Sequence, residues 1–154
     1  MAFCKKCGAE LDENAKQCPA CGAPVEEEKE SAEKKFADLN NTADATGEYD
    51  SEDIENNKVM GVLAYIGILF LVPLLAAPKS RFARFHANQG LVLFLAEIIL
   101  GVVAGVLGFI PIVGWIVRSV VSVVGLILMI LGIVNAASGK AKELPVIGKF
   151  KLLK

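Results

Sequence analysis

Four cysteines near the start of the chain form the clearest chemical pattern in the sequence. Cys4 and Cys7 make one Cys-x-x-Cys unit and Cys18 and Cys21 make another, each followed by a glycine. Two thiolates three positions apart in a tight turn can hold the same metal ion, and the glycine permits the positive φ that such a turn needs. Two turns facing each other would build a four-sulfur cage for one structural Zn²⁺ ion. The alternative is a redox dithiol, but that chemistry needs a βαβ scaffold larger than residues 1–24 can supply.

These residues also resemble the short zinc-ribbon module found at the N-termini of many bacterial membrane and regulatory proteins, and the resemblance covers about residues 3–23. A module this short cannot bury enough apolar surface to fold alone, so zinc binding would supply its folding free energy. Four cysteines leave no coordination position for water, which argues against catalytic zinc. Because the module has few basic residues and an acidic stretch follows it, we expect no nucleic-acid partner.

The two parts of the chain carry net charges of opposite sign. Residues 1–58 hold seven lysines against fifteen Asp and Glu, whereas residues 59–154 hold nine Lys and Arg against two glutamates. The acidic stretch after the cysteines has too few large apolar residues to offset the entropy cost of ordering it. We therefore predict four parts: a zinc ribbon at 1–24, a flexible acidic linker at 25–58, a three-helix transmembrane domain at 59–137 and a basic amphipathic tail at 138–154.

Three apolar stretches, residues 59–77, 90–110 and 116–137, determine the expected fold class. A membrane helix needs about 20 predominantly apolar residues to cross a hydrocarbon core of roughly 30 Å, and each stretch meets that requirement. We therefore predict an all-α, multi-pass membrane protein, in which the zinc ribbon and the linker precede three transmembrane helices. The lipid bilayer of the cell membrane is its first expected partner.

Small residues on the second apolar stretch predict a helix-packing face. Gly101, Gly105 and Gly108 follow Glu97 at helical spacing, so the four residues lie on one side of a helix. Gly101 and Gly105 form a Gly-x-x-x-Gly motif, which lets another backbone approach closely. We expect this face to pack against a protein partner or a second copy of the chain. Glu97 should then face protein, because a carboxylate exposed to lipid is costly.

The polar segment before this stretch holds the other candidate site residues. Arg84, His86, Asn88 and Gln89 lie among basic and aromatic residues, as expected at the depth of the lipid headgroups. One interpretation is structural: Asn88 and Gln89 begin or cap the next helix, and His86 is an interfacial polar side chain. The other is functional: these residues and Glu97 line a polar path. The sequence leaves both interpretations open.

Two arguments about membrane orientation disagree. Three spans place the first loop and the tail on one side of the membrane and the N-terminus on the other. Eight Lys and Arg residues lie in that loop and tail, so the positive-inside rule places both in the cytoplasm. The zinc ribbon would then be exported, although its thiolates are safer in a reducing compartment. We favour the cytoplasmic side for the zinc ribbon.

Residues 63–75, 82–90 and 137–148 resemble a family of small bacterial membrane proteins, and the middle segment includes His86-Ala87-Asn88-Gln89-Gly90. This family is grouped with the twenty-kilodalton component of the chloroplast inner-envelope import translocon. The resemblance spans about residues 60–150. It implies a multi-pass membrane protein with a part in protein translocation.

Two functional hypotheses follow. The first is a non-enzymatic membrane protein that assembles with other membrane helices through the face of Gly101 and Gly105, with the zinc ribbon as a tethered interaction module. The second is a component of a transport or protein-translocation system, with a polar path at Glu97 and residues 86–89. We set an intramembrane enzyme aside, because the sequence lacks a paired acid and base or an activated nucleophile.

Overall fold

The computed structural model describes residues 2–4, 6–11, 17–22, 34–108 and 110–153. The chain divides into two compact units, Met1–Asn41 and Thr42–Lys154. Residues 25–33 of the predicted linker lie outside the described part of the chain.

A two-stranded antiparallel sheet organises the N-terminal unit. Its strands are β1 (Ala2–Phe3) and β2 (Glu10–Leu11). The glycines that follow the two Cys-x-x-Cys units, Gly8 and Gly22, adopt positive φ values of 75° and 68°. Each glycine amide donates a hydrogen bond to the carbonyl of the first cysteine in its unit, at 2.7 and 2.8 Å respectively. These turns confirm the backbone that the glycine positions predict.

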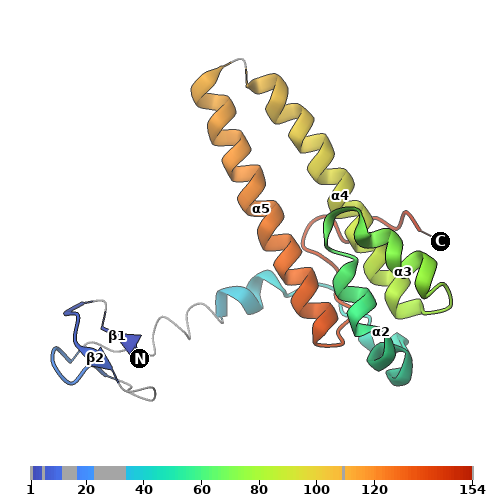
Figure 1. The fold of residues 1–154 in the computed structure, drawn as a ribbon, viewed down its shortest axis with the longest axis horizontal. Helices are drawn as coiled ribbons and strands as arrows, with labels where there is room; N and C mark the ends of the chain where they lie inside the picture. Colours follow the sequence, from blue (N-terminus) through green and yellow to red (C-terminus); the bar gives the residue numbers. More distant parts are fainter. Residues whose placement is uncertain (1, 5, 12–16, 23–33, 109, 154) are drawn as a thin grey trace. The chain divides into compact units, whose positions relative to one another are not determined.

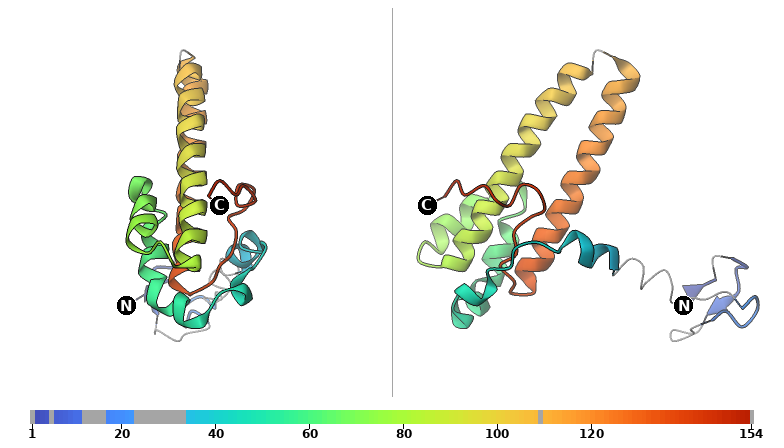
Figure 2. Two further views of the ribbon diagram at one scale, coloured as in Figure 1. Left: turned by 90° about the vertical axis from the view of Figure 1, so that its right-hand side faces the viewer. Right: turned by 180° about the vertical axis from the view of Figure 1, so that it is seen from behind.

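Helices make up most of the C-terminal unit (Figures 1 and 2). The two longest form an antiparallel hairpin, and the shorter ones gather against its open end (Figure 1). The helical content confirms the all-α prediction for this unit. In chain order the elements are η1 (Thr46–Glu48), α2 (Ser51–Leu63), η2 (Gly67–Phe70), α3 (Leu71–Ala76), α4 (Arg81–Leu107) and α5 (Pro111–Ala137).

The first predicted membrane span, residues 59–77, is not confirmed. α2 ends at Leu63, and Gly67 interrupts the helical path with a φ of 52°. The chain restarts as η2 and α3, with Pro73 in the first turn of α3, where a missing N–H costs least. The apolar run is therefore divided into pieces too short to cross a bilayer, which an average over its composition does not reveal.

The helix α2 begins inside the segment that we predict to be a flexible linker. The Asp50 carboxylate caps it by accepting a hydrogen bond from the amide of Glu52 at 2.8 Å. A carboxylate of α2 itself, that of Asp53, accepts a hydrogen bond from the amide of Phe82 at 3.1 Å, which satisfies an N–H at the start of α4. Two acidic residues of the predicted linker, Asp50 and Asp53, thus help to order the chain, because their carboxylates cap helices.

Two glycines allow the turn after α2 to sit against the hairpin. A Cβ at Gly90 on α4 would lie 2.7 Å from the carbonyl carbon of Ala64 and closer still to its oxygen. A Cβ at Gly132 on α5 would lie 2.5 Å from Cδ1 of Tyr65. Real Cβ atoms essentially never approach within 3.0 Å of such atoms, so both positions need glycine. Ala64 and Tyr65 are buried as a result, with 0% and 2% of their surface exposed.

The hairpin has a packed end and an exposed end. The packed end, residues 42–93 and 131–153, is called the head here. Beyond it the side chains are largely exposed, as for Val102 and Val123 at 64% and 56%. Within the described residues, two helices are long and apolar enough to cross a membrane, Arg81–Leu107 and Ile112–Ala137. In an apolar stretch of 18 residues in each helix, only 22% and 28% are buried. Such exposed apolar helices favour a lipid environment over the core of a soluble protein.

The chain after α5 returns across the head and pairs with the segment that precedes α2. The amide of Ala45 donates to the carbonyl of Ala141 at 3.0 Å, and the amide of Glu143 donates to the carbonyl of Ala43 at 3.0 Å. Asp44 and Lys142 form the antiparallel bridge between them. The segment before α2 and the segment after α5 are therefore neighbours in the structure, although both long helices lie between them in the sequence.

Candidate functional site

The four cysteines come together as the spacing predicts. Their sulfur atoms all lie within 4.8 Å of one another, with Cys4 and Cys21 at 3.7 Å and Cys7 and Cys18 at 3.5 Å. A tetrahedral Zn²⁺ site with Zn–S bonds of about 2.3 Å places its sulfurs about 3.8 Å apart. The geometry of the residues therefore fits a zinc ion with four thiolate ligands.

Electrostatics also favour a cation between these sulfurs. The backbone N–H groups of Lys6 and Cys7 lower the pKa of the Cys4 thiol to about 6, because they stabilise its thiolate. The backbone N–H of Ala9 has the same effect on Cys7, but the neighbouring thiols of Cys21 and Cys18 outweigh it and raise the pKa of Cys7 to about 12. Four thiolates this close repel one another unless a cation neutralises them. The N-terminal unit binds one structural Zn²⁺.

In the C-terminal unit, Asn88 holds the end of the chain. It lies in the interior of α4 and is only 6% exposed. Its Nδ2 donates to the carbonyl of Phe150 at 2.8 Å, and its Oδ1 accepts from the amides of Leu152 and Leu153 at 2.7 and 2.9 Å. One side chain thus satisfies three backbone groups of a segment that forms no regular secondary structure.

Gln89 does the same for the preceding part of the tail. Its Nε2 donates to the carbonyl of Gly148 at 2.9 Å, and its Oε1 accepts from the amide of Leu144 at 3.2 Å. We call Asn88 and Gln89 the tail clamp. Neither residue caps α4, whose start is capped by the Oγ of Ser80, which accepts from the amide of Ala83 at 3.0 Å.

His86 belongs to the core of the head. Its ring is completely buried and packs edge-on against Phe82 and Phe85, with ring centroids 4.6 and 5.2 Å away. Its Nδ1 is hydrogen-bonded to the hydroxyl of Tyr65 at 2.9 Å. Within the part of the chain that the structure describes, its Nε2 has no hydrogen-bond partner. The surroundings are those of a packing residue and not of a side chain at a membrane surface.

Glu97 does not join the other polar residues. It lies nine positions after Asn88 on α4, which corresponds to about 13 Å along the helix. Its side chain turns toward α5, where its Oε1 would lie 2.8 Å from a Cβ at Gly125. Among the described residues, Glu97 is therefore separated from the tail clamp along α4.

The predicted packing glycines fall into two groups. Near the tip of the hairpin, a Cβ at Gly114 would lie 2.5 Å from the Cα of Gly108, so these glycines let the chain turn tightly. At Gly101 and Gly105, no described atom other than those of the surrounding α4 backbone lies within 4 Å of an added Cβ. The Gly-x-x-x-Gly face thus has open space in front of it within this chain.

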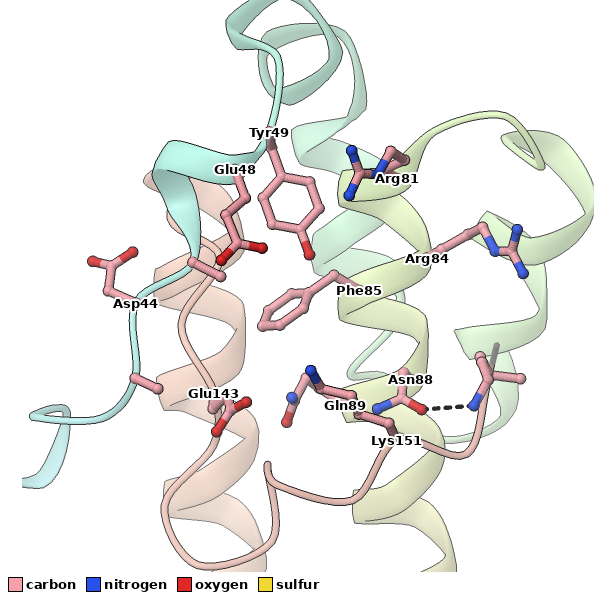
Figure 3. Close-up of a pocket in the computed structure, with 13 residues that line it drawn as sticks. Asp44, Glu48, Tyr49, Arg81, Arg84, Phe85, Asn88, Gln89, Glu143 and Lys151 are labelled. Atoms are coloured by element: carbon pink, nitrogen blue, oxygen red, sulfur yellow. Dashed lines mark hydrogen bonds between the residues drawn. The ribbon is translucent and has the colours of Figure 1, made fainter.

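Arg84 and the tail clamp border a cavity that the sequence does not reveal. It has a volume of about 460 Å³ and lies between α4, the segment 43–49 and the tail (Figure 3). Arg81 and Tyr49 also line it, and the Arg81 guanidinium lies over the Tyr49 ring at 5.7 Å. Burial raises the pKa of Tyr49, so its phenol stays protonated at neutral pH. Tyr49 lies far from Arg81 in sequence, and no local pattern links the two.

Comparison with known proteins gives two family matches. A family described as the magnetosome magnetite crystal formation protein family matches residues 56–151, and the zinc-ribbon domain matches residues 3–25. The second match agrees with the predicted zinc ribbon. No solved structure matches the chain.

Three relatives illustrate the first match. A UPF0132 membrane protein of Methanocaldococcus jannaschii is 36% identical over 93 residues, which are 57% of this chain and 62% of that protein. The magnetosome proteins MamF and MmsF of Paramagnetospirillum magneticum are 34% and 35% identical, over 62% and 58% of this chain and 82% and 79% of their own lengths. The chain thus spans less than two thirds of the archaeal protein and more of the two magnetosome proteins.

These matches correct the family predicted from the sequence. The resemblance to proteins grouped with the chloroplast import component is wrong, because the same part of the chain, about residues 60–150, matches the magnetosome protein family. The first segment behind that resemblance, residues 63–75, is almost entirely apolar, and apolar stretches of other membrane proteins share such composition. The translocation role that the resemblance implied has no support from the matched proteins.

Proposed function

Since the chain belongs to the MamF/MmsF magnetosome protein family, we propose that it is a non-enzymatic membrane protein that crosses the bilayer twice. The α4–α5 hairpin is the anchor, and both the head and the zinc ribbon are on the cytoplasmic side of the membrane. The head and the ribbon serve as binding surfaces for other components at the membrane.

The pairing of segment 43–46 with segment 141–143 carries this proposal. Both segments exchange backbone hydrogen bonds, so they must lie in the same compartment. The chain between them must then cross the membrane an even number of times. The two long apolar helices meet that condition, whereas three spans would place the paired segments on opposite sides.

Two crossings also remove the conflict between the two orientation arguments. The cations near the start of α4 and the lysines of the tail then lie on the same side as the N-terminal flank of the hairpin. Residues 25–41 contain no apolar stretch that could cross a bilayer, so the zinc ribbon shares that side. The positive-inside rule and the preference of thiolates for a reducing compartment now both favour the cytoplasm.

The roles of the polar residues support binding over catalysis. His86 packs among aromatic rings, and Asn88 and Gln89 are occupied by the backbone of the tail. Four cysteine ligands close the zinc coordination shell. The family description concerns magnetite crystal formation, and the archaeal relatives are described as membrane proteins. A membrane-anchored scaffold is compatible with both descriptions and requires no reaction.

Labelling with a membrane-impermeant maleimide in intact cells tests the topology. Ser51→Cys and Ser138→Cys place thiols on either side of the hairpin, and Ile112→Cys places one at its tip, with sites located by peptide mass spectrometry. We expect the tip to react in intact cells and the other two to react only after permeabilisation. Reaction of Ser51→Cys and Ser138→Cys from opposite sides of the membrane would refute the two-crossing topology.

A further inference from the structure

The cavity of the head has a basic wall along α4. Arg81 and Arg84 lie three positions apart on the helix and so share a face. Lys151 joins them because the tail clamp fixes its neighbours: Asn88 binds the carbonyl of Phe150 and the amide of Leu152. The clamp therefore places Lys151, a third cation of the lining, beside Asn88 and Gln89 (Figure 3).

The opposite wall is acidic and comes from the paired segments. Asp44 and Glu48 precede α2, and Glu143 is held beside them by the hydrogen bond from its amide to the carbonyl of Ala43 at 3.0 Å. Asp44 accepts hydrogen bonds from the hydroxyl and the amide of Thr46, and these lower its pKa. The carboxylate is therefore ionised at neutral pH and fixed in position.

Aromatic rings lie between the two walls. Tyr49 and Phe85 pack edge-on, with ring centroids 5.8 Å apart, and both line the cavity. Figure 3 shows them between the acidic residues and the arginines. The face of an aromatic ring attracts an ammonium group, and a neighbouring carboxylate strengthens that attraction.

The charges of the lining identify the class of ligand. Three acidic and three basic side chains line the cavity, so its formal charge is zero, and Figure 3 shows the acidic residues on one side and the two arginines on the other. The acidic wall would repel a simple anion, and the basic wall would repel a simple cation. A zwitterion with a primary ammonium at one end and a phosphate at the other can satisfy both, since Arg pairs with phosphate and carboxylates pair with ammonium.

The position of the cavity indicates where such a ligand comes from. The tail that forms part of its rim exposes Val146, Phe150 and Leu152, at 89%, 61% and 52%. The exposed apolar part of α4 begins at Leu95, about two turns after the tail clamp. Exposed apolar groups next to cations are typical of the lipid headgroup region. If the hairpin is the membrane anchor, as proposed above, the cavity lies at that depth.

We infer that the cavity between α4, segment 43–49 and the tail binds the headgroup of a phospholipid that carries both a phosphate and a primary amine, as phosphatidylethanolamine does. The basic wall binds the phosphate, and the acidic wall and the two rings bind the ammonium group.

The test uses the full-length protein in nanodiscs with equal amounts of phosphatidylethanolamine, phosphatidylcholine and phosphatidylglycerol. After gentle detergent release, native mass spectrometry counts the lipids that stay bound. We expect about threefold enrichment of phosphatidylethanolamine, and we expect Glu48→Gln with Glu143→Gln to abolish it and favour phosphatidylglycerol. The matched control, Glu52→Gln with Glu55→Gln, removes the same charge from α2 outside this cavity and should keep the enrichment.

Equal retention of the three lipids, or unchanged enrichment in the Glu48/Glu143 variant, would overturn the inference. Adding soluble glycerophosphoethanolamine distinguishes the source: displacement of the lipid at micromolar concentration would mean that a free metabolite is the ligand. Incorporation into the nanodisc is recorded separately. A protein that incorporates but shows no lipid preference refutes the headgroup site alone, whereas one that fails to incorporate refutes the membrane anchor and this inference with it.

Discussion

Substituting Gly90 by alanine should destabilise the head, although the same change in most helices is stabilising. Alanine is favoured over glycine in a helix interior by about 1 kcal/mol. At Gly90, however, the new Cβ would lie 2.7 Å from the Ala64 carbonyl carbon, whereas ordinary contact begins at 3.4 Å. The turn after α2 would have to move away from α4, and overpacking of this kind typically costs about 1–3 kcal/mol, occasionally more. Because contact with the carbonyl oxygen is closer still, we place the cost at the upper end.

The net effect of Gly90→Ala is then a loss of about 2 kcal/mol, which would lower Tm by roughly 10 °C for a unit of this size. Thermal unfolding followed by far-UV circular dichroism in a mild detergent measures it. Gly101→Ala on the same helix is the matched control, because an added Cβ there has no described neighbour within 4 Å apart from the surrounding backbone of α4. We expect this control to leave Tm unchanged or to raise it by a few degrees. Gly90→Ala with a Tm equal to or above that of the parent protein would refute the close approach of α4 and Ala64.

Three further predictions concern the tail, the zinc ribbon and pH. Asn88→Ala removes three hydrogen bonds to the tail, each of which contributes about 1 kcal/mol. Hydrogen exchange at the Leu152 amide should therefore accelerate by about a hundredfold, while exchange in α5 stays the same. Unchanged exchange at Leu152 would disprove the clamp. Chelation of zinc should unfold residues 1–23 and leave the helical circular dichroism signal intact. A loss of the helix signal would show that the two units depend on each other. The pKa of Asp44 is lowered in the folded protein, so its contribution to stability is present above the pKa of the unfolded chain and is lost as the pH falls through the folded pKa. Proteolysis of the tail should therefore increase below about pH 4, and Asp44→Asn should show the same susceptibility at neutral pH.

The features that the sequence predicts correctly depend on residues close together in the chain. The zinc cage follows from Cys-x-x-Cys spacing, because each pair of ligands is set by one local turn. The two long helices follow from continuous apolar composition. The first span fails for a local reason too: Gly67 adopts a positive φ, which ends the helical path although the residues around it remain apolar. Composition alone does not distinguish a helix that crosses a membrane from a set of shorter pieces.

The head could not be predicted in the same way, since its contacts join distant parts of the chain. Asn88 binds Leu152, and Asp53 caps α4 at Phe82, across 64 and 29 positions. The sequence predicts that the polar segment before the second span holds site residues, but it does not predict that Asn88 and Gln89 bind the tail. Only the fold shows that a buried amide is satisfied by a backbone segment at the other end of the domain.

The family match includes the basic wall of the cavity but begins after most of the acidic wall. The match covers residues 56–151, which includes Arg81, Arg84 and Lys151, whereas Asp44 and Glu48 precede it. The basic wall and the tail clamp thus belong to the part that this chain shares with its relatives, and most of the acidic wall does not. A basic wall alone favours a phosphate without regard to the rest of the headgroup. Recognition of the ammonium group therefore depends on the segment before α2, and replacing residues 43–48 by a neutral sequence of equal length should convert selective binding of phosphatidylethanolamine into general binding of anionic lipid.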